Sequence, residues 1–225
     1  ADFHPVAFAL IDLVAYRSQY MGKRPLKDEL TYRFYESHPF LHKGKVFMFL
    51  QKGYDRKAFE KLAEEFHLKV VISNPVDELY NIPKMYDLVL EALNIVVDES
   101  VGQGNVFYVS QLAVPIMLNK MRDYDKLISQ KILSLADYDR RKESQYCETL
   151  YYYLACDHSL KDTCEALFTH RNTILYRIRK MKEDFEIPLD DSDLHFKLLL
   201  EVSLILLKEK GSGFFISKPD SAEEN

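Results

Sequence analysis

The strongest constraint on the fold is a change of hydrophobic pattern about halfway along the chain. Before residue 112, short runs rich in Val, Ile, Phe and Tyr alternate with segments whose apolar residues recur every three or four positions. This pattern is typical of strands alternating with helices. The predicted strands are Val6–Leu10, Lys45–Leu50, Lys69–Ser73 and Asn105–Val109. The predicted helices between them are Leu26–Tyr35, Arg56–Phe66 and Pro83–Val97.

From Leu112 onward only the helical period remains. The predicted helices are Leu112–Arg122, Ile128–Ala136, Ser144–Ala155, Ser159–Phe168, Arg171–Phe185 and Ser192–Lys208. We therefore expect an α+β protein, with an N-terminal α/β domain in residues 1–125 and an all-helical domain in residues 126–210. Residues 211–225 begin with Gly-Ser-Gly and are predicted to be a disordered tail.

The charge of the chain restricts how it can bind nucleic acid. Its 30 Lys or Arg and 35 Asp or Glu give a formal charge of −5, which excludes a protein that coats nucleic acid with its whole surface. The charge is uneven, because residues 141–182 hold eight basic and five acidic side chains, whereas residues 183–225 hold four and eleven. One internal segment is therefore a candidate for local binding.

The sequence offers no metal, cofactor or membrane signal. The cysteines Cys147, Cys156 and Cys164 are odd in number and lack metal-ligand spacing, so we expect no metal, no cofactor and a reducing, cytoplasmic location. Two apolar runs, Phe3–Tyr16 and Leu194–Leu207, are shorter than the roughly 20 residues of a bilayer span and carry charged residues. No membrane contact is expected.

The basic segment contains two predicted helices with almost no loop between them. Ser159 followed by Asp162 is a capping pattern that starts the first helix. Its apolar positions recur at i, i+4 and i+7: Leu160, Cys164 and Leu167. The second helix begins near Arg171. A short helix, a tight turn and a basic second helix are typical of a helix-turn-helix motif.

The second helix separates an apolar face from a polar one. The predicted core positions are Ile174, Ile178, Met181 and Phe185. The polar face and its N-terminal end carry the candidate DNA-binding residues His170, Arg171, Asn172, Thr173, Tyr176, Arg177, Arg179 and Lys180. Arg pairs bidentately with guanine and Asn with adenine, while Thr, Tyr and Lys hold phosphates. For His170, capping the helix and touching DNA are both open.

Thr149 to Leu207 resembles the C-terminal helix-turn-helix domain of PucR/CdaR-type bacterial transcriptional regulators. The most recognisable signature is His170-Arg-Asn-Thr173 followed by Tyr176-Arg177. Residues 5–120, with VVISNPVDELYNIPKMYDLVLEAL and YVSQLAVPIML, are similar to the degenerate GGDEF-like domain that precedes this motif in the family. The resemblance implies a transcriptional regulator that binds double-stranded DNA. A homodimer is expected, because one short helix contacts few base pairs.

The chain departs from the general helix-turn-helix pattern in its turn. Phe168 stands where Gly is frequent and Thr169 where an aliphatic residue is frequent, and Cys164 replaces the usual Ala. The turn must therefore form without a residue that favours positive φ. Family members usually carry an upstream sensory region, and nothing in these residues corresponds to it, so the sequence assigns no effector.

Two other classes of function compete with DNA binding. A diguanylate cyclase needs adjacent glycines followed by acidic residues, and no two of the seven glycines are adjacent, so enzyme activity is not expected. An interaction protein that keeps the fold without binding DNA is the other alternative. It is favoured by the six acidic residues in 183–193, which can repel phosphate or shield the basic helix.

Overall fold

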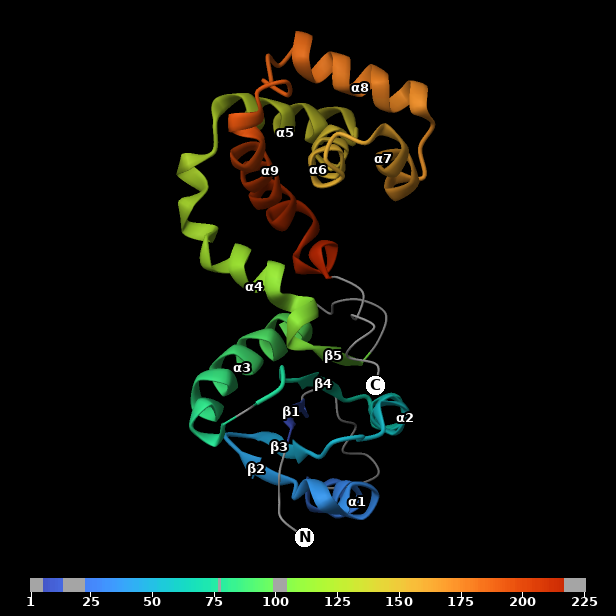
Figure 1. Cartoon of the computed structure of the whole chain (residues 1–225), viewed down its shortest axis with the longest axis vertical. Helices are drawn as coiled ribbons and strands as arrows, with labels where there is room; N and C mark the ends of the chain where they lie inside the picture. Colours follow the sequence, from blue (N-terminus) through green and yellow to red (C-terminus); the bar gives the residue numbers. More distant parts are fainter. Residues whose placement is uncertain (1–5, 14–22, 77, 99–104, 217–225) are drawn as a thin grey trace. The chain divides into compact units, whose positions relative to one another are not determined.

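The structure is a computed structural model that describes residues 6–13, 23–76, 78–98 and 105–216 (Figure 1). The chain divides into two compact units. The second unit is Met117–Phe214, and the described residues on either side of it belong to the first. The predicted boundary at residue 125 lies inside the second unit. No helix within the described ranges is long and apolar enough to cross a membrane.

The first unit contains a mixed five-stranded sheet with the order β2-β3-β1-β4-β5. Strand β1 (Ala7–Asp12) is central and pairs antiparallel with β3 (Lys45–Leu50) and β4 (Lys69–Ile72). Strand β2 (Phe40–His42) pairs antiparallel with β3, and β5 (Val106–Tyr108) is parallel to β4. All four predicted strands are present.

The sheet is covered by helices on both faces. Ala9 and Ile11 of β1 belong to the core formed with α1 (Lys23–Arg33) and α2 (Arg56–Phe66). Phe8 and Leu10 belong to the core formed with α3 (Ile82–Asp98). Successive side chains of a strand point to opposite faces, so a strand buried on both sides has a continuous apolar run. The three predicted helices are confirmed, with small shifts at their ends.

Strand β2 is an element that the sequence pattern did not predict. It has three residues, all exposed, at the edge of the sheet. Lys43 at φ 47° and Gly44 at φ 80° form the tight turn that joins it to β3, a geometry that suits a two-residue hairpin. A short, solvent-facing edge strand carries no alternation of buried and exposed residues, so hydrophobic periodicity does not detect it.

The second unit is helical, and no strand occurs after residue 112 among the residues that the structure describes. Its helices are α5 (Gln130–Lys142), α6 (Tyr146–Ala155), α7 (Leu160–Leu167), α8 (Arg171–Glu183) and α9 (His195–Lys210). Helix α4 (Ala113–Lys120) runs across the division between the units. Helix α6 packs against α5, α7, α8 and α9 and is therefore the centre of this unit.

The expected disorder from Gly211 onward is wrong for the residues that directly follow α9. Ser212–Phe215 form a 3₁₀ turn in which Ser212 is fully buried. The ring of Phe214 lies 5.3 Å from that of Tyr151 and 5.7 Å from that of Tyr152. This aromatic packing orders a stretch whose Gly-Ser-Gly composition suggested a tail. Residues 217–225 lie outside the described residues.

Candidate nucleic-acid interface

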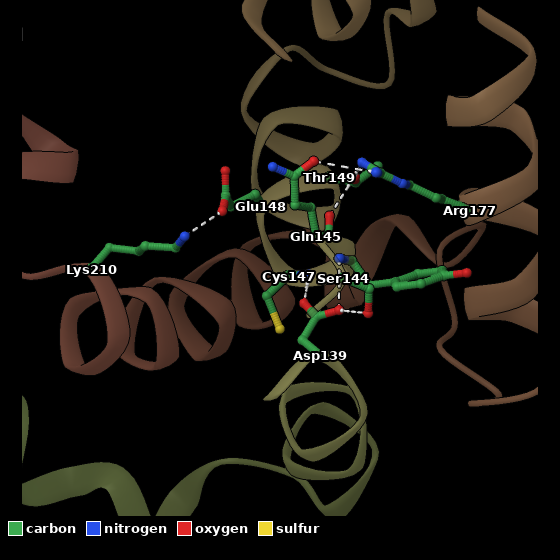
Figure 2. Close-up of polar contacts among 9 residues, drawn as sticks. Asp139, Ser144, Gln145, Cys147, Glu148, Thr149, Arg177 and Lys210 are labelled. Atoms are coloured by element: carbon green, nitrogen blue, oxygen red, sulfur yellow. Dashed lines mark hydrogen bonds and ion pairs between the residues drawn. The ribbon is translucent and has the colours of Figure 1, made fainter. Parts of the chain in front are cut away.

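Helix α6 is the platform for the basic segment, and its first turn is held by α5. The carboxylate of Asp139 accepts hydrogen bonds from the backbone N–H of Tyr146 at 2.9 Å and of Cys147 at 2.7 Å (Figure 2). Ser144 Oγ donates to the same carboxylate at 2.7 Å. A negative charge satisfies the free amides at a helix N-terminus. Asp139 therefore fixes the point at which α6 begins.

Helix α7 begins where the sequence predicts, but the residue that it buries most deeply is not one of its predicted apolar positions. Ser159 Oγ accepts from the backbone N–H of Asp162 at 3.3 Å, which confirms the predicted cap. The predicted apolar positions of the helix are only half-buried, whereas Thr163 is fully buried. Thr163 Oγ1 donates to the carbonyl of Ser159 at 2.7 Å. Because its hydroxyl is satisfied within the helix, threonine is tolerated in the core.

The turn between α7 and α8 depends on Phe168. This residue adopts φ 49° and ψ 41°, the left-handed conformation that glycine favours, and its side chain is 98% exposed. The backbone N–H of Thr169 donates to the carbonyl of Cys164 at 3.1 Å and closes the turn. Left-handed backbone is unfavourable for a residue with a Cβ. The turn thus keeps the usual geometry at a cost in conformational energy.

Helix α8 buries the face that the sequence predicts. Ile174, Ile178 and Met181 are buried, and Phe185, just beyond the helix, is half-buried. The ring of Phe185 packs edge-on against Tyr138 of α5, with centroids 5.4 Å apart. The opposite face of α8 is therefore turned to solvent.

The N-terminal part of that exposed face carries solvent-exposed polar side chains. Arg171, Asn172 and Thr173 are all exposed, and Tyr176 is 50% exposed one turn later. In the described ranges, the side chains of Arg171 and Asn172 make no hydrogen bond or ion pair. His170 occupies the N-cap position without a side-chain capping bond. These groups are available to a ligand.

The basic residues of the C-terminal part of α8 are paired with acids. Arg179 Nε lies 3.9 Å from Glu183 Oε2, and Lys180 Nζ lies 3.4 Å from Asp184 Oδ2. Lys182 Nζ lies 2.6 Å from Asp190 Oδ1. Lys180 Nζ also sits 5.3 Å from the ring centroid of Tyr138. A hydrogen bond with Tyr138 raises the pKa of Lys180 above its ordinary value, so this side chain stays cationic.

Arg177 lies differently from the other candidate residues. Its Nη1 donates to Thr149 Oγ1 at 2.9 Å and its Nη2 donates to Gln145 Oε1 at 3.2 Å, both on the α6 side (Figure 2). The structure therefore brings six of the eight predicted residues to the outer face or N-terminal end of α8, turns Arg177 toward α6 and places the half-buried Lys180 over the ring of Tyr138 of α5. Sequence reasoning did not identify Gln145, Thr149 or Asp139, because contacts between helices leave no periodic signal.

A pocket of about 570 Å³ opens beside the turn between α7 and α8. Lys161, His170 and Arg171 contribute basic groups to its lining, and Glu165 contributes an acidic one. Lys161 and Glu165 are 4.0 Å apart and both largely exposed. The pocket adjoins the free end of α8 and belongs to the same surface.

The short α7, the tight turn and the basic outer face of α8 define a helix-turn-helix domain. Residues 146–204 match the family described as the PucR C-terminal helix-turn-helix domain. This segment is therefore a helix-turn-helix domain of the PucR type.

Three curated relatives, all from Bacillus subtilis (strain 168), are similar to parts of the chain. The purine catabolism regulatory protein is 25% identical over 134 residues, 59% of this chain and 25% of that protein. The proline-responsive transcriptional activator PutR is 27% identical over 161 residues, which cover 67% of this chain and 38% of that protein. The DNA-binding transcriptional activator AdeR is 27% identical over 88 residues, which cover 39% of this chain and 21% of that protein. The chain thus spans well under half the length of each relative.

One solved structure is also similar, a regulator of polyketide synthase expression from Bifidobacterium adolescentis. The match covers 91% of this chain and 80% of that chain at 11% sequence identity, with a TM-score of 0.37. Similarity at this level does not establish a shared fold.

Proposed function

We propose that this chain is a sequence-specific DNA-binding regulator of transcription, with α8 in the major groove of double-stranded DNA. The observation that carries the proposal is the exposed N-terminal end of α8, where the side chains of Arg171 and Asn172 have no polar partner among the described residues. Guanidinium and amide groups are the side chains that pair bidentately with guanine and adenine. The similarity to three transcriptional regulators supports the same class of function.

The remaining residues of the face suit contacts with the DNA backbone. Thr173, Tyr176, Arg179 and Lys180 present hydroxyl and cationic groups along α8, and His170 stands at its N-terminal end. Free amides and the helix dipole at this end favour a phosphate. Phosphate contacts fix orientation, whereas base contacts select sequence. Arg171 and Asn172 are the proposed readers.

The test is a titration of the full chain into a fluorescently labelled pool of random duplexes, followed by selection of the tightest-bound sequences. Binding should weaken steeply as salt rises, because cationic side chains displace condensed counterions. Arg171→Ala with Arg179→Ala should weaken binding to the selected duplex by at least about tenfold. Lys57→Ala with Lys61→Ala on α2 removes the same charge from exposed sites of the first unit and serves as the control. Equal losses in the two variants contradict the proposal.

The DNA-bound form is proposed to be a homodimer. A two-fold pair of α8 helices doubles the site that one short helix reads. Sedimentation velocity at micromolar concentration, with and without the selected duplex, measures the assembly. A monomer in both conditions contradicts this part of the proposal.

The first unit is proposed to be a degenerate GGDEF-like domain without cyclase activity. Its helices on both faces of a mixed sheet support the architecture, and the absence of adjacent glycines in the sequence supports the loss of activity. Incubation with GTP and Mg²⁺ should yield no cyclic dinucleotide. A regulator of this kind works in the cytoplasm, where bacterial DNA lies.

The acidic partners of Arg179, Lys180 and Lys182 favour a second candidate function, a domain that contacts proteins alone. In that case the C-terminal charges of α8 are neutralised within the fold. The same titration separates the two candidates, since a protein-only domain binds no duplex even at low salt.

A further inference from the structure

We infer that Arg177 is a positioning residue of α8, which acts through Gln145 and Thr149 of α6 to set the orientation from which Arg171 and Asn172 reach DNA. The inference rests on the proposed function for its DNA readout. Its geometric basis lies wholly within the second unit, in the contacts between α6 and α8.

The Thr149 hydroxyl is arranged to accept from Arg177. Thr149 is fully buried, and its Oγ1 donates its only proton to the backbone carbonyl of Gln145 at 2.6 Å. The lone pairs that remain on Oγ1 receive Arg177 Nη1 at 2.9 Å. A buried hydroxyl whose proton is already committed can bind a second polar group only as an acceptor. A guanidinium, which only donates, is its complement.

Gln145 is free to receive the second bond because Asp139 caps α6 in its place. Gln145 stands at the N-cap position of α6 and makes no side-chain capping bond. The Asp139 carboxylate takes the amides of Tyr146 and Cys147 instead. The Gln145 side chain therefore extends toward α8, where Oε1 accepts from Arg177 Nη2 at 3.2 Å (Figure 2).

The two bonds add a direction that the apolar contacts of α8 lack. Ile174, Ile178 and Met181 hold α8 against the core, but hydrophobic contact is not directional. A planar guanidinium that donates to two residues of α6 resists rotation of α8 about its own axis. Recognition sites need their groups held within about 0.5 Å and 10–20°, so base reading depends on this restraint.

The same arrangement separates Arg177 from the arginines that face solvent. Arg171 and Arg179 are exposed, whereas Arg177 is half-buried and has both Nη atoms bonded within the protein. Arg177 contributes positive charge near the DNA, but both Nη atoms of its guanidinium already donate hydrogen bonds to α6 and Gln145. Its removal should therefore alter selectivity more than general attraction to DNA.

The test is a double-mutant cycle on the full chain with two probes, the duplex selected by the wild type and a shuffled duplex of the same composition. Thr149→Val with Gln145→Leu removes both acceptors without changing the charge or the surface of α8. This variant should lose about tenfold in affinity for the selected duplex, as expected for hydrogen bonds to a charged group. Its affinity for the shuffled duplex should change by less than about twofold.

The added effect of Arg177→Ala distinguishes positioning from contact. In the Thr149→Val, Gln145→Leu background, Arg177→Ala should cost less than about a further twofold for the selected duplex. The salt slope on the shuffled duplex should stay unchanged. A loss that adds in full to the first, together with a slope that falls by about 1, is the signature of a direct phosphate contact and overturns the inference.

Conservative variants protect the test against simple misfolding. Thr149→Ser keeps the hydroxyl and Gln145→Glu keeps an acceptor, so both should retain selectivity, and loss of selectivity in both contradicts the inference. A thermal-unfolding cycle of Arg177→Ala and Thr149→Val without DNA should be non-additive. If the wild type binds no duplex, the proposed function fails. The thermal-unfolding cycle then tests by itself whether Arg177 restrains α8 through Thr149, and an additive result refutes that restraint.

Discussion

The carboxylate of Asp139 on α5 accepts a hydrogen bond of 2.7 Å from the backbone N–H of Cys147 on α6. This bond caps one helix with a side chain from another. It leaves the local cap residue, Gln145, free to hold Arg177 of α8. A single buried acid thus connects the start of α6 to the orientation of the basic helix.

Asp139→Ala should lower the free energy of unfolding by about 2–4 kcal/mol, because the half-buried hydroxyl of Ser144 and two buried helix amides lose their acceptor. Urea denaturation followed by circular dichroism measures the change. Asp137→Ala is the matched control, since Asp137 is exposed and pairs with the exposed Arg140; its effect should stay below about 1 kcal/mol. Similar losses in the two variants contradict the assigned role.

Phe168→Gly should be more stable than Phe168→Ala by about 1 kcal/mol. Both changes remove a ring that is 98% exposed, but only glycine relieves the left-handed backbone at φ 49°. Thermal unfolding of the two variants gives the difference directly. Equal stability, or greater stability of the alanine variant, indicates that the backbone at this turn is not strained.

Cys147 should react with iodoacetamide more slowly than Cys164 in the folded protein. Burial, together with the negative charge of Asp139, raises the pKa of the Cys147 thiol, so the reactive thiolate is suppressed at pH values that ionise an ordinary thiol. Cys164 is half-buried and lines the pocket beside the turn. Peptide mass spectrometry follows both sites. The rates should converge in urea, and equal rates in the folded state oppose the prediction.

Arg171→Ala and Lys180→Ala should weaken DNA binding in different ways. Loss of Arg171 should cost about 1–3 kcal/mol and relax selection at one base position, whereas loss of Lys180 should weaken all sequences alike. Asp184→Asn should act opposite to Lys180→Ala, because Asp184 is the acid 3.4 Å from Lys180. Selection from random duplexes with each variant shows the pattern. Unchanged preference in Arg171→Ala argues against base reading.

The elements of this protein were largely predictable from periodicity. Strand β3 and helix α2 occupy their predicted residues, and Ile174, Ile178 and Met181 face the core as expected. Strong amphipathic patterns survive folding because each buries its own apolar face. Strand β2 was not predicted because its three exposed residues show no alternation of buried and exposed positions. The ordered turn after α9 was not predicted because it depends on Tyr151 and Tyr152, which are distant in sequence.

In the candidate site too, some features follow from local sequence spacing and others from the packing of helices. The sequence by itself determined the helix-turn-helix, the cap at Ser159 and the set of polar residues on α8, because these follow from local spacing. Only the tertiary structure decided that Arg177 turns toward α6, that Lys180 lies over the ring of Tyr138 of α5, and that Phe168 adopts a left-handed backbone. Whether a side chain meets solvent or a partner depends on helix packing, which brings together groups that no sequence period relates.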